Sequence, residues 1–100
     1  ITIDGRHKLY INKTNAEDNH YDIQVGANAN INIQVDDGDV NIHTVKGKIN
    51  MNAGGDYNLK VGGNYTVEVA GNTSETIEGT KTSNTTGAVI HRGATIDLNP

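Results

Sequence analysis

Four histidines are the side chains of this sequence best suited to bind a metal ion or to transfer a proton. His7, His20, His43 and His91 are too widely spaced for a metal motif, whose ligands usually stand a few residues apart. We expect the first three to face solvent. His91 falls at an inward position of a sequence repeat, so three identical chains would bring three imidazoles near one axis, where they could bind a metal ion or an anion.

The acidic clusters give weaker chemical signals. Asp36-Asp37-Gly38-Asp39 lacks the loop length and the distal Glu of an EF-hand, so we interpret it as a turn or bulge. Gly54-Gly55-Asp56 is similar to a calcium-binding β-roll repeat, but those repeats have a period of nine and a recurring Asp, which this sequence lacks. No Ser/His/Asp set or carboxylate pair forms a recognisable catalytic pattern. We therefore predict no enzyme activity and no required cofactor.

The composition excludes several protein classes. The 100 residues are 34% hydrophobic and include no Phe, Trp or Cys, so a compact core within one chain would be poor. No run approaches the roughly 18 apolar residues of a membrane span. The net charge of −4 is too acidic and too dispersed for a nucleic-acid partner. Because position 1 is Ile rather than Met, we expect a fragment of a longer protein.

The elements that must position any functional residue are short strands. Ile, Val and Thr together number 30, against 7 Ala and 3 Leu, which favours strands over helices. Glycine recurs at every eighth position from Gly47 to Gly87, and apolar and polar residues alternate between these glycines. Alternation is the period of a half-buried strand, and a recurring glycine permits a sharp bend between strands.

The even repeat length keeps the same positions on one face, because only an odd shift exchanges the two faces of a strand. We expect the odd-numbered positions of the repeat to face inward. The predicted core residues are Met51, Leu59, Val61, Val67, Val69 and Ile77.

Residues 71–86 are more polar and place Glu75 and Lys81 at inward positions. Rings of like charge are costly inside a protein unless they are paired, so we expect this section to hold ions or waters, with the two rings partly compensating each other. The alternative is that the register slips here and that both side chains face solvent.

One octad buries too few side chains to be stable alone, so neighbouring repeats must stack. Three octads of one chain could form a coil of a single-chain β-solenoid. Alternatively, three identical chains could interwind around a shared core, which would pair every strand edge with another chain. The second arrangement is favoured because all octads carry the glycine equally, without the 24-residue modulation and capping segments expected of a solenoid.

The repeated motif is V-x-G followed by five residues. Its copies are Val45-Lys46-Gly47, Val61-Gly62-Gly63, Val69-Ala70-Gly71 and Ile77-Glu78-Gly79, with Ala53-Gly54-Gly55 and Thr85-Thr86-Gly87 as looser copies. The motif resembles the triple-stranded β-helix of contractile-tail central spikes, which include the membrane-piercing spike of T-even-type phages and the valine-glycine-repeat (VgrG) spikes of type VI secretion. The strict match covers residues 45–94. The lysozyme and oligosaccharide-binding domains of the phage spike are not recognisable in these 100 residues, so no enzyme activity carries over.

This resemblance implies an all-β, intertwined homotrimer that acts mechanically. Such a spike would belong to the baseplate of a virion tail, puncture the outer membrane of a Gram-negative host and be extracellular during penetration. Its blunt C-terminal end would dock a tip protein of the PAAR-repeat class. Some relatives instead carry an iron site with a His-x-His motif, which this sequence lacks. The alternative function is a trimeric fibre or adhesin stalk, or a single-chain β-solenoid spacer.

The sequence predicts three segments. Residues 1–22 contain a weaker strand region and a polar loop, residues 23–94 form the octad-type β-helix, and residues 95–100 form a C-terminal tip platform. After Gly93 the apolar positions change phase to Ile96 and Leu98, and Pro100 cannot donate to a further strand ladder. We therefore expect the octad pattern to lapse after Gly93, and we expect Ile96, Leu98 and Pro100 to dock the tip protein.

Overall fold

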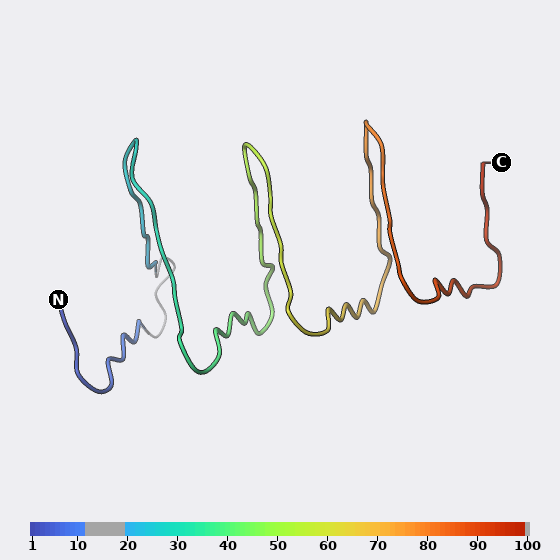
Figure 1. The fold of residues 1–100 in the computed structure, drawn as a ribbon. Helices are drawn as coiled ribbons and strands as arrows, with labels where there is room; N and C mark the ends of the chain where they lie inside the picture. The colour runs from blue at the N-terminus through green and yellow to red at the C-terminus, as the bar shows by residue number, and fades with distance from the viewer. Residues whose placement is uncertain (12–19, 100) are drawn as a thin grey trace. The chain divides into compact units, whose positions relative to one another are not determined.

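The computed structural model describes residues 1–11 and 20–99. None of these residues belongs to a helix or to a hydrogen-bonded strand; the backbone runs in extended stretches that are separated by bends (Figure 1). An extended chain gains ladder hydrogen bonds only from a neighbouring strand. No two described residues that are twelve or more positions apart have Cα atoms within 8 Å of each other. The predicted β character is thus present as extended backbone, without the predicted strand pairing.

The chain divides into two units, Ile1–Asn52 and Ala53–Pro100. In the second unit the bends fall at residues 54–55, 62–63, 70–71, 78–79 and 86–87, a constant spacing of eight. Each of these bends coincides with the x-G step of the V-x-G motif. The repeat therefore positions the corners of the chain.

The corner spacing continues one step beyond the predicted end of the octad pattern. A further bend lies at Ala94, eight residues after the bend that begins at Thr86, although no glycine stands at position 95. The next bend, at Leu98, follows only four residues later, so the spacing of eight does not continue past Ala94. The expected lapse of the octad pattern near the C-terminal end therefore stays a prediction.

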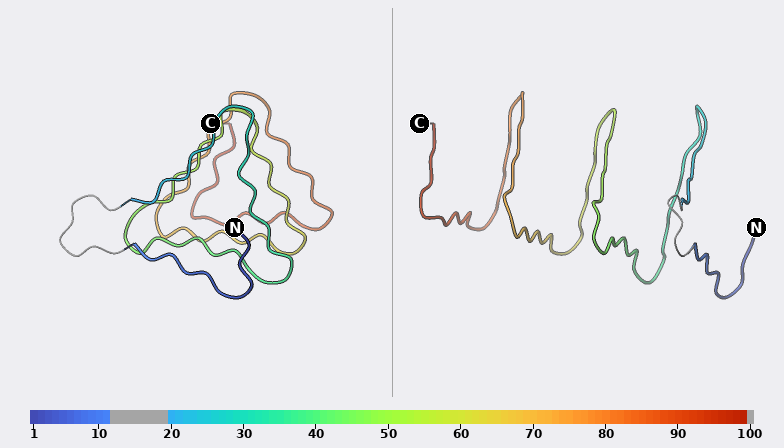
Figure 2. Two further views of the ribbon diagram at one scale, coloured as in Figure 1. Left: turned by 90° about the vertical axis from the view of Figure 1, so that its left-hand side faces the viewer. Right: turned by 180° about the vertical axis from the view of Figure 1, so that it is seen from behind.

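Within Ala53–Pro100 the successive stretches turn in the same sense and follow the sides of a triangular path when seen end-on (Figure 2). One circuit of this path takes three octads. In a single-chain solenoid, stacked coils pair at about 4.8 Å. No described residues so far apart in sequence approach within 8 Å, so stacked coils of a single chain are not formed here, and the choice between the trimer and the solenoid stays a prediction.

The first unit has different corners. A turn lies at 27–28, and bends lie at 4–5, 36–38 and 45–47. The bend at 36–38 confirms the turn predicted there, and Gly38 adopts a φ of 141°. The predicted polar loop lies mostly within residues 12–19, outside the described residues, as does Pro100 at the other end of the chain.

Two local hydrogen bonds accompany these corners. The Gly47 backbone N–H donates to Thr44 Oγ1 at 3.2 Å, which ties the chain across the 45–47 bend. The Gln34 side-chain amide donates to Asp36 Oδ1 at 2.7 Å, just before the bend at 36–38. Polar side chains thus support the corner at 36–38, which has no octad motif, and the corner at 45–47, where the octad motif begins.

The described residues form no core of their own. Every large hydrophobic side chain in the described ranges is exposed, and none of the described residues is buried. A globular protein of 10.7 kDa exposes about 5,500 Å², whereas this chain exposes 11,550 Å². Such a chain cannot be stable as an isolated globule, because burial of apolar surface is the main force that favours folding.

Candidate functional site

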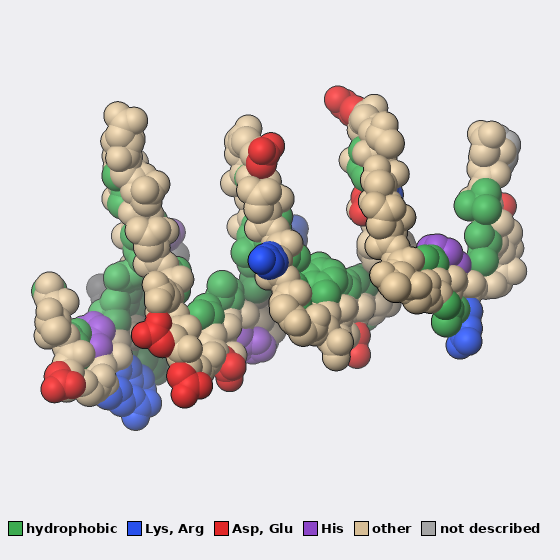
Figure 3. All heavy atoms as spheres, viewed as in Figure 1, with side chains coloured by type: hydrophobic (Ala, Val, Ile, Leu, Met, Phe, Trp, Pro, Cys, Tyr) green, Lys and Arg blue, Asp and Glu red, His purple; other side chains and the backbone are tan. Residues whose placement is uncertain are grey.

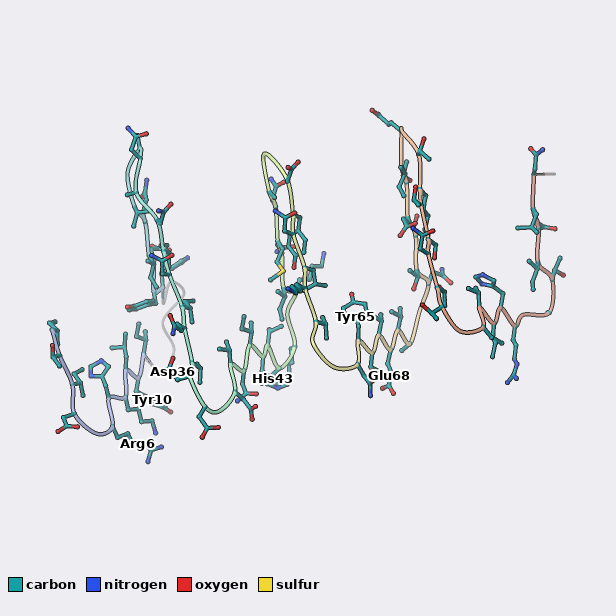
Figure 4. The ribbon with its side chains drawn as sticks, in the orientation of Figure 1. Arg6, Tyr10, Asp36, His43, Tyr65 and Glu68 are labelled. Carbon is teal, nitrogen blue, oxygen red and sulfur yellow. The ribbon has the colours of Figure 1, made fainter. Side chains whose placement is uncertain are left out.

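The most prominent functional feature is one face of Ala53–Pro100, which we call the inner face. It carries the odd-numbered positions of the repeat. Figure 4 shows the geometry at the stretch that contains Tyr65 and Glu68: Tyr65 points to the side toward which the flanking stretches turn, and Glu68 points to the opposite side. Odd positions of this stretch therefore lie inside the bends, as the alternation predicts.

An ion pair gives the same assignment independently. Lys81 Nζ contacts Glu75 Oε1 across the bend at 78–79. Side chains on the inside of a corner converge, whereas those on the outside diverge. A contact between residues three positions before and three positions after Glu78 therefore places both on the inside. Whether both side chains face solvent or an interior after assembly stays a prediction, because both are exposed in the single chain.

The predicted core residues share this face, but a single chain leaves them uncovered. Their exposed fractions are substantial: 59% for Leu59, 42% for Val61, 61% for Val67 and 46% for Ile77. Met51 in the first unit, at 67%, and Val69, at 50%, are similar. Figure 3 shows such hydrophobic side chains lying open along the chain. Their burial in an assembled core stays a prediction.

The polar section of the inner face is also accessible. The side chains of Lys81 and Glu75 are 64% and 56% exposed. At this exposure an ion pair adds little to stability, because water screens it and both side chains lose conformational freedom. The contribution of this pair would grow only if another chain covered it.

The octad glycines have no steric explanation within the chain. At Gly55, Gly63, Gly71, Gly79 and Gly87 an added Cβ would meet no described atom within 4 Å beyond the adjacent residues, and φ is outside the left-handed region. Gly47 differs, because a Cβ there would lie 3.2 Å from Thr44 Oγ1. Within the described residues, glycine at most octad corners is thus not enforced by a steric contact.

The C-terminal end exposes its apolar residues. Ile96 is 53% exposed and Leu98 is 86% exposed, and Asn99 adopts a left-handed φ of 55°. Since the bend at Ala94 keeps the spacing of eight, Asp97 and not Ile96 or Leu98 occupies the register position equivalent to Lys81. Docking of a tip protein by Ile96 and Leu98 stays a prediction, and Pro100 lies outside the described residues.

In the described part of the chain, no metal-binding group or pocket is formed by one chain alone. No group of three or more His, Cys, Asp or Glu residues there could hold a metal ion. No pocket is present over the described ranges either. The predicted axial site at His91 needs three chains and therefore stays a prediction. Among residues 1–11 and 20–99, no helix has the length and apolar character needed to cross a membrane.

One copy of the motif was missed from the sequence. Ile3-Asp4-Gly5 places a bend at 4–5, and Gly5 has a φ of 121°. His7 lies at the same parity as Leu9 and Ile11 and is exposed, so its solvent-facing position after assembly stays a prediction. On the opposite side Lys8 Nζ lies 5.5 Å from the centroid of the Tyr10 ring, a cation–π distance. The sequence signal for this copy was the I-x-G triplet, but Gly5 does not stand a multiple of eight residues before the later octad glycines.

Comparison with known families agrees with the geometry. The family model of the Gp5 C-terminal repeat matches residues 55–84 in three copies. No curated protein and no solved structure matches the chain. The matched segment includes the bends at 62–63, 70–71 and 78–79 and the ion pair between Glu75 and Lys81. Residues 55–84 are thus similar to three Gp5 C-terminal repeats, which confirms the resemblance to the C-terminal region of a phage Gp5-type spike and suggests a structural role in a β-helix-type phage spike.

Proposed function

We propose that this chain is part of the central spike of a contractile injection tail and works as an obligate homotrimer. Three copies would interwind into a triple-stranded β-helix whose core is formed by the inner faces. The observation that carries this proposal is the uncovered inner face: Leu59, Val67 and Val69 line one side of the chain with half or more of their surface exposed. Apolar surface so extended and regular requires a partner in water.

The path of the chain supports three copies. Within Ala53–Pro100 the chain completes a triangular circuit every three octads, and its own circuits stay more than 8 Å apart at the Cα atoms. Adjacent strands in a sheet lie about 4.8 Å apart. Strands of other chains can therefore enter between the circuits. Three chains would supply one strand each to every side of the triangle in turn, which would satisfy the unpaired backbone groups.

The proposed activity is mechanical. A rod with continuous ladders between chains and no long loops in its repeat would transmit the thrust of sheath contraction to the outer membrane of a Gram-negative host. This role uses no catalytic residue, no required cofactor and no nucleic acid. The spike would be carried in the baseplate of the virion and would be extracellular during penetration.

The C-terminal end would dock a tip protein of the PAAR-repeat class. Exposed Ile96 and Leu98 support this proposal, because two exposed apolar side chains so close in sequence can form part of a binding surface. We include Pro100 in the proposed docking surface. Axial His91 residues could bind a metal ion or an anion near this end, and ions or waters could occupy the section around Glu75 and Lys81.

The solution mass tests the assembly. Light scattering should give three times the chain's 10.7 kDa, with no folded single chain at any concentration, because stability and association are coupled. A folded particle of one chain would contradict the proposal. Passage of the trimer through outer-membrane vesicles under applied force would distinguish a spike from a fibre or adhesin stalk, which should bind or space without breaching the bilayer.

Tip docking needs a separate measurement. Replacing Ile96 and Leu98 with Ser should leave the trimer intact and abolish binding of a PAAR-type protein in a calorimetric titration. Ile90→Ser is the matched control, because Ile90 is a comparably exposed apolar residue before the last corner. Unchanged affinity in the double variant would show that the end is not a docking surface.

A further inference from the structure

The octad repeat creates an ambiguity of alignment between chains. Tyr57, Leu59 and Val61 occupy the same repeat positions as Tyr65, Val67 and Val69. If one chain slipped by eight residues along the others, apolar layers of Ala53–Pro100 would still meet apolar layers, and the octad corners of this unit would still coincide. Apolar packing therefore discriminates weakly between the correct alignment and a slipped one.

Glu75 and Lys81 break this repetition. Between residues 49 and 91 they are the only Asp, Glu, Lys or Arg at inner positions. They are joined across the corner at 78–79, yet both side chains keep more than half of their surface exposed. Polar atoms of each thus remain accessible to a second partner.

We propose that Glu75 and Lys81 set the alignment of the three chains by pairing between chains as well as within each chain. This inference rests on the proposed homotrimer. In an interwound helix that advances one side per octad, residues 71–78 of one chain lie beside residues 79–86 of a second copy on the same side. Glu75 is then a diagonal neighbour of Lys81 in that copy, within reach of long side chains.

Three chains in this alignment form a closed ring of six alternating charges. Each Lys81 has one Glu75 across the corner in its own chain and one beside it in the next chain. A slip of one octad removes every contact to the slipped chain's neighbours and sets Glu75 beside apolar or hydroxyl layers instead. Burial of these charged side chains by neighbouring chains is unfavourable when half of their ion-pair partners are missing. Burial of a complete network is tolerated. The best-attested role of buried polar groups is to fix the register of associating chains.

A charge swap tests the inference with the full chain. Glu75→Lys combined with Lys81→Glu keeps the composition and the pair within each chain, so the swapped chain should form trimers by itself. When it is refolded with the original chain in equal amounts, like charges would meet at every boundary between unlike chains. We expect native mass spectrometry to show mixed trimers about tenfold below binomial proportions, since several like-charge neighbours act together.

The matched control swaps charges on the outer side. Lys46→Glu with Glu78→Lys also conserves net charge, and neither residue has a charged residue one octad before or after it. Mixed trimers of this variant with the original chain should appear in binomial proportions. Binomial mixing of the Glu75 and Lys81 swap as well would overturn the alignment role and leave the trimer standing. Single chains in every sample would overturn the trimer itself, and the alignment role with it.

Discussion

The two units of the chain place their corners by different rules. In Ala53–Pro100 the bends recur every eight residues, whereas in Ile1–Asn52 the corners that begin at 27, 36 and 45 are nine apart. An odd spacing exchanges the two faces of an extended chain at each corner. The apolar positions accordingly change from odd at Val35 to even at Val40 and Ile42, and back to odd at Ile49.

The extra residue of the first unit is accompanied by special backbone geometry. Three of the four positive φ angles of the described residues lie there, at Gly5, Asn28 and Gly38, and the corner at 45–47 has the bond from Gly47 to Thr44. Bulges accommodate an added residue in a similar way, often with a left-handed residue. The even spacing of the second unit needs no such geometry at its octad corners, so the second unit is the more regular building unit for a rod.

The largest effect should follow from a charge in the middle of the inner face. Val67→Asp would place three carboxylates near the proposed axis, and an unpaired buried charge costs several kcal/mol, on the order of 3–5. We expect no trimer by light scattering. Thr66→Asp is the control on the outer side and should assemble normally; a normal trimer from Val67→Asp would overturn the inner-face assignment.

The next largest effect should follow from a deletion that changes the eight-residue spacing of the octad corners. Deleting the single residue Asn64 would exchange the faces of everything that follows, so assembly should be lost. Deleting all of residues 63–70 removes one complete octad and keeps the faces, so a shorter trimer should form. Comparison of the two particles by light scattering checks this expectation. Equal tolerance of both deletions would show that the faces of Ala53–Pro100 are not fixed by the repeat length.

Much of the second unit could be predicted from its sequence. The V-x-G steps predicted the bends at 54–55 through 86–87, and the alternation predicted which side Tyr65 occupies. The inward position of Glu75 and Lys81, which the spacing of the glycines predicts, stays a prediction. These features depend on local backbone geometry and on a period of two, both of which a sequence displays directly.

Other features could not be predicted so well. The bend at Ala94 was missed because its glycine stands at position 93, and the copy at Ile3-Asp4-Gly5 was missed because it stands alone. Strand pairing was expected between chains and stays a prediction, since ladder partners come from other segments or other chains and not from local sequence. The sequence suggested that the rings of Glu75 and Lys81 compensate each other, but it did not show that the two side chains meet across one corner of a single chain.

A smaller effect should follow from breaking the ion pair. Glu75→Gln leaves Lys81 without its partner, and in the assembled core this should reduce the free energy of unfolding by about 2 kcal/mol. The double variant with Lys81→Gln should recover part of the loss, since neither charge then lacks a partner. Thermal unfolding of the trimer at fixed chain concentration measures both. Equal stability of Glu75→Gln and the original chain would indicate that the pair stays in water after assembly.

The smallest expected effects on stability come from substituting a corner glycine in each unit, Gly38 in the first and Gly54 in the second. Gly38 has a φ of 141°, and an added Cβ would lie 3.4 Å from Val35 Cγ1, so Gly38→Ala should destabilise by about 1 kcal/mol. Gly54 has open space and an ordinary φ, and the equivalent position of later octads holds Ala70 or Glu78. Gly54→Ala should therefore change the stability by less than about 0.5 kcal/mol. Denaturant unfolding of the two variants at one chain concentration measures the difference; a larger loss for Gly54→Ala would mean that the octad corners, and not the odd-spaced ones, impose the stricter backbone requirement.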